Sequence, residues 1–340
     1  MSAVRTLIIM TLATLTLAQA VHAAEEVNLY SARKEKLIKP LLDRFTLQTG
    51  IKVNLVTGKA NALLARLKSE GMNTPADLLL TTDAGNLYRA QEAGLLQSIQ
   101  SQTLNNSVPS QYREPSGQWY GLSTRARTIF YSKSRVKPAE LNSYADLADP
   151  KWKGRICIRS SNNIYNQSLV ASMISYQGEA KTEAWVKGLV ANFARSPKGG
   201  DRDQIKAVAA GQCDIAIANT YYYGAMLQSK KADEKAAAAQ VNLFWADQKA
   251  RGTHVNISGG AVTKHAHNKA NAIKLLEFLV NDESQAWYAE VNNEYPVKSG
   301  IKVSKILGAW GPYKADTLDL HLLGKYNAEA VRVMDRAGWR

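Results

Sequence analysis

Sequence patterns of the common enzyme classes are absent from this chain of 340 residues. It contains no G-x-x-x-x-G-K-S/T phosphate loop, no G-x-G-x-x-G fingerprint, no G-x-S-x-G elbow and no H-E-x-x-H zinc motif. His265 and His267 do not replace them, because they lie in a polar stretch before a predicted helix and are typical of an ordinary surface. No general base stands beside a nucleophile, so we expect a protein that is not an enzyme.

A basic stripe with interleaved aromatic residues is also missing, although the formal net charge is +14. The Lys and Arg residues are dispersed along the chain, whereas nucleic-acid-binding proteins gather them on one face. We therefore expect no nucleic-acid partner. A dispersed basic surface suits an anionic ligand or a membrane-bound partner instead.

Long hydrophobic runs are confined to the N-terminus. Arg5 precedes an apolar run at residues 7–17, and Val21-His22-Ala23 ends in the small-x-small pattern of a signal peptidase site. The run is shorter than the roughly 20 residues that span a bilayer, so cleavage is favoured over anchoring. We expect a signal peptide at residues 1–23 and a soluble mature protein in the periplasm.

Cysteine is scarce, with only Cys157 and Cys213 in the chain. An oxidising compartment permits one disulfide between them. Both lie beside strand-like runs, which neighbouring strands could bring together. Two buried thiols that happen to lie near each other are the alternative.

The chain does contain an alternation of strand and helix patterns. Strands are expected at residues 27–30, 51–56, 78–80, 155–158, 214–218, 243–246 and 255–262, and helices at 35–48, 61–70, 86–93, 165–176, 181–194, 203–210, 269–280, 283–292 and 323–336. This alternation predicts a mainly parallel, right-handed α/β sheet. Two further strand-like pieces, 119–121 and 128–131, flank Arg125 and Arg127, and we expect that these two arginines cannot both face a cleft.

The length of the chain suits two lobes of ordinary size. We expect an N-terminal lobe from residues 24–123 plus 248–298 and a C-terminal lobe from 124–247 plus 299–340, joined by strands that pass between them. Two α/β lobes connected in this way form the architecture of periplasmic solute-binding proteins, in which closure about a hinge buries a ligand from both sides.

Three consecutive tyrosines, Tyr221, Tyr222 and Tyr223, follow the buried strand pattern CDIAIA after a polar break. Neighbouring side chains on extended backbone point to opposite faces, so packing alone explains the run poorly. At the end of a strand in an α/β sheet, these side chains would face the crevice in which such proteins hold ligands. We interpret the run as half of a metal site with phenolate ligands, and ordinary aromatic packing is the alternative.

Four segments in order, behind a signal peptide, resemble the periplasmic ferric-ion-binding proteins of ABC importers. They are NLYSAR at residues 28–33, LSTRAR at 122–127, SSNNIYNQS at 160–168 and NTYY at 219–222. The likeness extends over nearly the whole mature chain. It implies a type II two-lobed fold with hinge strands near residues 122–125 and 251–257. It also implies a monomeric carrier that binds ferric ion and serves an inner-membrane ABC permease.

The resemblance further implies that Tyr165, Tyr221 and Tyr222 are the iron ligands, while Tyr223 packs against its own lobe. Ferric ion is a hard cation that prefers anionic oxygen, and a phenol supplies it once its proton, with a pKa of about 10, is displaced. Three phenolates balance the three positive charges of the ion and leave coordination positions open.

A synergistic anion, carbonate in our prediction, would fill these open positions. Ser160, Ser161 and Asn162 are good N-cap residues before the helix that carries Tyr165, so free backbone N–H groups would face the anion. Arg125 would add a planar, two-pronged donor.

The sequence departs from the family just after the first strand, where many members have a histidine that supplies a ligand from the first lobe. Here the residues are Arg33, Lys34 and Glu35. Glu35 either replaces the missing ligand with a carboxylate or only favours the start of its helix through the helix dipole. Arg33 would help to bind the anion.

Two other functions fit some of these residues. Tyrosine rings can hold an organic cation, and the arginines a small organic anion, so a carrier for a polyamine or a phosphonate is the main alternative. An exported enzyme with a tyrosine–iron centre would need an open position for a substrate, and nothing in the sequence supplies the accompanying general base.

Overall fold

The computed structural model describes residues 25–340. The expected signal peptide at residues 1–23 therefore lies outside the described residues. Within residues 25–340, no helix combines the length and the apolar character needed to cross a membrane.

Eight strands form one sheet with the order β2-β1-β3-β8-β4-β6-β5, and β7 pairs with β4 beside this path. The strands are β1 (Glu26–Ser31), β2 (Lys52–Thr57), β3 (Leu78–Thr82), β4 (Tyr120–Ser132), β5 (Ile156–Cys157), β6 (Ile215–Asn219), β7 (Val241–Phe244) and β8 (Val255–Val262). The sheet is mixed, so the prediction of a mainly parallel sheet was wrong. Among these described strands only the β1–β2, β1–β3 and β5–β6 pairs are parallel, and the two central strands β4 and β8 run antiparallel to every neighbour.

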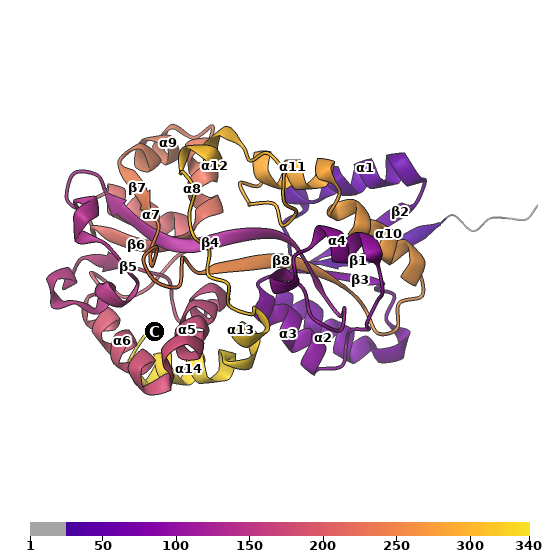
Figure 1. Ribbon diagram of the computed structural model, residues 1–340, viewed down its shortest axis with the longest axis horizontal. Coiled ribbons are helices and arrows are strands. Elements are labelled where there is room, and N and C mark those ends of the chain that lie inside the picture. The colour runs from indigo at the N-terminus through magenta and orange to yellow at the C-terminus, as the bar shows by residue number, and fades with distance from the viewer. Residues whose placement is uncertain (1–24) are drawn as a thin grey trace, which may run out of the picture.

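The strand β4 is the longest of the described strands, and all of its 13 residues are buried. It unites the two short pieces that the sequence predicts on either side of Arg125 and Arg127. Residues 120–126 pair with β8, and residues 127–131 pair with β6, so β4 changes partners between Ala126 and Arg127. Figure 1 shows β4 and β8 running between two groups of elements, which are the two halves of the molecule.

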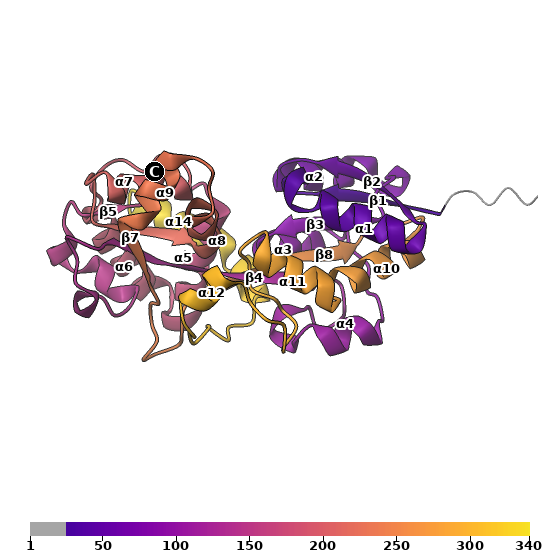
Figure 2. The ribbon, with the colours of Figure 1, turned by 90° about the horizontal axis from the view of Figure 1, so that it is seen from above.

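Helices cover the sheet in both halves (Figures 1 and 2). One half contains α1 (Lys39–Thr49), α2 (Ala60–Glu70), α3 (Ala84–Glu92), α4 (Gln102–Ser107), α10 (Lys269–Leu279) and α11 (Asp282–Glu290), and the other contains α5 (Ile164–Gln177), α6 (Glu179–Ala191), α7 (Asp201–Ala209), α8 (Thr220–Leu227) and α9 (Ala232–Ala239). The predicted helix at 35–48 is interrupted, because a short 3-10 turn, η1 (Glu35–Leu37), precedes α1 and Pro40 occupies the first turn of α1. Proline is tolerated there because its missing N–H would have no partner within the helix.

The C-terminal segment contains three short helices and contacts both halves. They are α12 (Lys305–Ala309), α13 (His321–Lys325) and α14 (Asn327–Arg336). Leu320 and Leu323 pack in a buried cluster with residues of the first half, such as Leu87, whereas Val333 and Met334 pack in the core of the second half. The lobe boundaries expected from the sequence stay a prediction.

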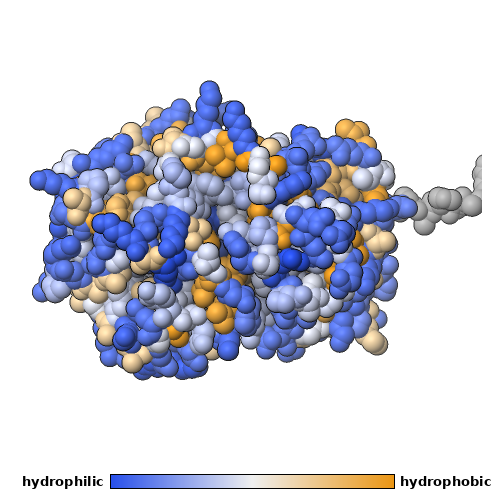
Figure 3. All heavy atoms as spheres, viewed as in Figure 1, coloured by the Kyte–Doolittle hydropathy of each residue, from blue (hydrophilic) through white to orange (hydrophobic). Residues whose placement is uncertain are grey.

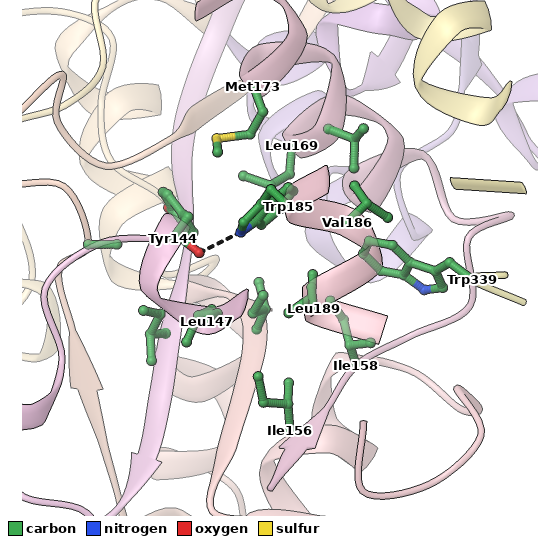
Figure 4. Close-up of a cluster of buried hydrophobic side chains, with 14 of the residues drawn as sticks. Tyr144, Leu147, Ile156, Ile158, Leu169, Met173, Trp185, Val186, Leu189 and Trp339 are labelled. Carbon is green, nitrogen blue, oxygen red and sulfur yellow. Dashed lines mark hydrogen bonds between the residues drawn. The ribbon is translucent and has the colours of Figure 1, made fainter. Parts of the chain in front are cut away.

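The core of the second half gathers side chains from its sheet and from the helices packed on it. Figure 4 shows Leu169 of α5 beside Trp185 of α6, in the same buried cluster as Leu189 and Ile156. The indole Nε1 of Trp185 donates a hydrogen bond of 2.7 Å to the carbonyl oxygen of Tyr144, so this polar atom is satisfied inside the core. The outer face in Figure 3 is largely hydrophilic, and its hydrophobic residues form only small separate groups.

Cys157 of β5 and Cys213, just before β6, form a disulfide, as the sequence predicts. Their Cα atoms lie 5.9 Å apart, because β5 and β6 are neighbours in the sheet. Both cysteines are buried in a cluster with Phe130 and Met226. The bond therefore joins two strands whose pairing covers only two residues.

Removing this disulfide should lower the free energy of unfolding by about 4 kcal/mol, because the two cysteines are 56 residues apart and a closed loop of that size restricts the unfolded chain. Urea denaturation of the wild type with and without a reductant measures the change. The double variant Cys157→Ser/Cys213→Ser is the control, since its unfolding midpoint should not respond to reductant. Equal midpoints for the oxidised and the reduced wild type would contradict the prediction.

Candidate metal centre

The tyrosine run lies in the first turn of a helix rather than on a strand. β6 ends at Asn219, whose backbone is extended, and α8 begins at Thr220. The sequence prediction of extended backbone was wrong here, because the strand pattern ends before the tyrosines and nothing in the run itself forbids a helix. Successive helical residues point about 100° apart, so the three side chains take three directions.

Two of the three tyrosine side chains lie near the surface, and the third lies in the core. Tyr221 and Tyr222 are half-buried, and their ring centroids lie 4.3 Å apart. Tyr223 turns into the core, where its ring packs against Phe130 and its hydroxyl donates a hydrogen bond of 2.9 Å to the carbonyl oxygen of Val241. The prediction that Tyr223 packs against its own half is confirmed.

Tyr165 comes to the same place from α5. It is the second residue of that helix, and its backbone N–H donates to the side chain of the N-cap residue Asn163, over 3.1 Å. The N-cap is thus one residue later than the sequence predicts. The hydroxyl of Tyr221 donates a hydrogen bond of 3.2 Å to the hydroxyl oxygen of Tyr165. The structure therefore brings Tyr165, Tyr221 and Tyr222 together, although their role as ligands stays a prediction.

The phenols of α8 are hard to ionise without a cation. Burial raises the pKa of Tyr221 well above its usual value, and the neighbouring Tyr165 and Tyr222 raise it further, while Arg125 opposes the shift. Burial and Tyr165 raise the pKa of Tyr222 to about 12, against a smaller effect of Arg159. Both hydroxyls therefore keep their protons at neutral pH, and a bound metal ion would have to displace them.

Arg125 is the most conspicuous charge beside these phenols. Its side chain is buried on β4, and within residues 25–340 its Nη1 and Nη2 atoms have no hydrogen-bond partner. The guanidinium carbon lies 5.8 Å from the centroid of the Tyr165 ring. Together with Asp83 and Asn256, both residues line a small recess. The buried carboxylate of Asp83 lines the same recess, and Arg125 lowers the pKa of that carboxyl group against the larger effect of burial, which raises it. The two Nη atoms of Arg125 nevertheless make no hydrogen bond within the described residues, and buried donors without a partner are costly, so they are available to bind an anion.

Arg127 faces the same recess as Arg125, against the expectation that only one of them does so. Residues two positions apart on a strand share one face, so that expectation was wrong. Arg127 is not a surface residue either. Its Nη1 atom lies 3.1 Å from a carboxylate oxygen of Asp201 and 3.1 Å from the side-chain oxygen of Asn219, deep in the second half.

Arg33 is buried and already paired. Its guanidinium donates hydrogen bonds to the carboxylate of Glu294 and, over 3.4 Å, to the hydroxyl of Ser258. It also lies 5.2 Å from the ring centroid of Tyr288. The charge of Arg33 is thus largely neutralised by Glu294, and a role in binding an anion stays a prediction.

Glu35, the candidate ligand from the first half, is exposed in η1. It lines a shallow groove with Lys39 and Asp43 of α1 and with residues of β2. Within the described chain its carboxylate makes no hydrogen bond or ion pair with the tyrosines. Ligation by Glu35 stays a prediction.

The predicted anion donors before α5 have other partners. The backbone N–H of Ser161 points to the carbonyl oxygen of Arg340 at 3.4 Å, and the backbone N–H of Asn162 donates to the hydroxyl of Ser160 at 3.3 Å. Anion binding by Ser161 and Asn162 would require these contacts to change, and it also stays a prediction.

Two charged residues near the phenols were not predicted from the sequence. The guanidinium carbon of Arg159 lies 5.6 Å from the ring centroid of Tyr165, and Asp201 is fully buried beside Arg127 and Arg159. Arg159 comes directly before the SSNNIYNQS segment, which was a usable signal, whereas Asp201 follows an unremarkable glycine pair. Within residues 25–340, no three His, Cys, Asp or Glu side chains gather as a metal site, so the phenols are the candidate ligands.

The chain is similar to known proteins both in sequence and in fold. The sequence model of a family described as bacterial extracellular solute-binding proteins matches residues 73–307. Iron uptake protein A1 of Synechocystis sp. is 51% identical over 93% of this chain and 88% of its own length. The Fe(3+)-binding periplasmic protein of Serratia marcescens is 31% identical over 84% of this chain and 82% of its own length. A solved structure of Trichodesmium IdiA (FutA) in complex with iron and citrate superposes with a TM-score of 0.90, at 52% identity over 93% of this chain and all of the other.

Proposed function

This chain belongs to the bacterial extracellular solute-binding proteins, and on that premise we propose that it is a periplasmic ferric-ion-binding protein that delivers Fe³⁺ to an inner-membrane ABC permease. The observation that carries the proposal is the convergence of Tyr165, Tyr221 and Tyr222 beside the buried guanidinium of Arg125. The relatives named above are uptake and binding proteins, and the protein acts as a carrier rather than as an enzyme.

The chemistry of the cluster selects ferric ion among possible ligands. A trivalent hard cation prefers anionic oxygen, and three phenolates from Tyr165, Tyr221 and Tyr222 would neutralise it within a half-buried site. A polyamine would instead place its own positive charges next to the guanidinium of Arg125. The neutral phenols alone could not compensate this repulsion.

The guanidinium of Arg125 supports a synergistic anion as the second component, since its two Nη atoms have no hydrogen-bond partner among residues 25–340. A guanidinium offers two parallel donors to a planar oxyanion, so carbonate fits as a small bidentate ligand between Arg125 and the iron. The Trichodesmium protein was solved with citrate as well as iron, and citrate is therefore the other anion to test.

The site also bears on how the iron is released. Opening of the two halves, loss of the anion, protonation of the phenolates and reduction to Fe²⁺ each remove part of the ligand field. We propose that the protein works as a monomer and that the permease receives the ion after at least one of these steps.

The direct test is the colour of the protein. Protein purified from the periplasm and supplied with ferric ion should take up one iron per chain and develop a visible phenolate-to-iron absorption band, more strongly with bicarbonate or citrate than without either. A thermal-shift screen on the same sample should give a higher melting temperature with ferric salts than with polyamines or phosphonates. A colourless protein stabilised by one of the organic ligands would overturn the proposal.

A further inference from the structure

Asp201 is a buried carboxylate that contacts several elements of the candidate metal centre. It is the first residue of α7, and its side chain is fully shielded from solvent. One oxygen lies 3.1 Å from Nη1 of Arg127 and accepts a hydrogen bond of 2.9 Å from the backbone N–H of Asn219. The other oxygen lies 3.5 Å from Nη1 of Arg159.

The contact with Asn219 fixes the start of the tyrosine helix. Asn219 ends β6 and immediately precedes α8. Its position therefore determines where α8 begins and where Tyr221 and Tyr222 lie. Its side-chain oxygen accepts a second hydrogen bond, of 3.1 Å, from Arg127. Asp201 and Arg127 thus hold Asn219 at both its backbone and its side chain.

The contact of Asp201 with Arg127 extends the same hydrogen-bond network to the helix that carries Tyr165. Nη2 of Arg127 donates a hydrogen bond of 2.5 Å to the side-chain oxygen of Asn166, the neighbour of Tyr165 on α5. The amide nitrogen of Asn166 donates in turn to the carbonyl oxygens of Arg159 and Ser160, at 2.9 and 3.1 Å. The segment that leads into Tyr165 is therefore connected to Asp201 through Arg127.

Asp201 also balances charge. Arg127 and Arg159 both point at it, and Arg159 lies beside the Tyr165 ring. Without this carboxylate Arg127 and Arg159 would lose their shared counter-charge, and breaking a buried ion pair leaves an uncompensated charge that destabilises the arrangement around it. Arg159 would then compete with Arg125 for the anion, or would shift the Tyr165 ring that it covers.

We propose that Asp201 is a positioning residue for ferric-ion binding. It fixes the N-terminal ends of α5 and α8, which carry the tyrosines, relative to each other, and it keeps Arg127 and Arg159 in place. The inference rests on the proposed function. A group behind the ligands that orients them typically changes metal affinity by about 10- to 100-fold when it is removed, and that range is the effect expected here.

The test compares Asp201→Asn and Asp201→Ala with the wild type in ferric titrations at saturating bicarbonate. Asp201→Asn keeps an acceptor for Asn219 but loses the charge, and Asp201→Ala loses both. We expect a ferric affinity lower by about 10-fold for the first and about 100-fold for the second, with a displaced phenolate-to-iron band at saturating iron. Asp233→Asn is the control, because it removes an exposed carboxylate of the same half that pairs with Lys206 at the surface, and it should leave affinity and band unchanged.

The position of the band separates positioning from mere support of the fold. A structural role would lower the melting temperature of the variants but leave the band of the folded, iron-saturated protein as in the wild type. That result, or an unchanged affinity in Asp201→Asn, would overturn the inference. Circular dichroism shows whether each variant folds. If Asp201→Ala does not fold, the isosteric Asp201→Asn alone tests the inference. A wild type that binds no iron would overturn the proposed function and this inference together.

Discussion

Replacing Tyr221 by phenylalanine should lower the affinity for ferric ion by roughly 150- to 4000-fold and remove much of the visible band. The change leaves the ring and its packing against Tyr222 in place but deletes the oxygen that lies 3.2 Å from the hydroxyl of Tyr165. The bound ion would then keep one uncompensated positive charge, close to the guanidinium of Arg125. Removing one partner of a buried charge pair costs about 3–5 kcal/mol, which corresponds to the stated loss in affinity.

The neighbouring residue supplies a matched control. Tyr223→Phe makes the same chemical change two positions along α8, but this hydroxyl donates to the carbonyl oxygen of Val241 inside the core. We expect Tyr223→Phe to cost about 1 kcal/mol of stability while its ferric affinity and its spectrum stay as in the wild type. Competition titrations against a chelator, read at the visible band, measure both variants. Equal affinities for Tyr221→Phe and Tyr223→Phe would show that Tyr221 does not ligate the iron.

The fold class and the family could be predicted from the sequence because both depend on patterns spread over the whole chain. Apolar periodicity located most strands and helices within a few residues, and the order of four short segments indicated a ferric-ion-binding protein with two lobes. The disulfide between Cys157 and Cys213 was also predicted correctly.

The direction of the central strands could not be predicted in the same way. An alternation of strand and helix gives parallel strands only where the helix carries the chain back to the end of the sheet at which the previous strand began. β8 comes back to the first half after all the strands of the second half, β5, β6 and β7, and it lies between β3 and β4, antiparallel to both. The hydrophobic pattern of the sequence does not show which distant strands pair or in which direction they run.

The candidate site was predicted through its aromatic residues, whereas its charge balance was not. The tyrosines stand in an unusual run, and Arg125 lies in a recognisable segment. Arg33, however, is neutralised by Glu294, which is 261 positions away in the chain, and Arg127 is neutralised by Asp201, which is 74 positions away. Which arginine is left to bind an anion depends on these distant carboxylates, so only the structure distinguishes Arg125 from the others.

Binding of ferric ion should weaken steeply as the pH falls, by about 1000-fold for each pH unit near neutrality. Burial raises the pKa of Tyr222 to about 12 and the pKa of Tyr221 well above its usual value, so both phenols are protonated in the free protein. If Tyr165 ligates as well, three protons leave when the ion enters, and each displaced proton contributes a factor of ten per pH unit. The sign follows from mass action, since added protons favour the free, protonated site.

The proton count can be measured separately from the affinity itself. Competition titrations between about pH 6 and pH 8, corrected for the protonation of the chelator and of the synergistic anion, should give a logarithmic affinity that rises with a slope close to three. Tyr222→Phe has one ionisable ligand fewer, and its slope should fall to about two even though its affinity is lower at every pH. A wild-type slope of one or less would mean that at most one phenol loses its proton, which contradicts a site of three phenolates. A slope of three would make acidification a strong contribution to release of the iron, because a drop of one pH unit would cancel about 4 kcal/mol of binding free energy.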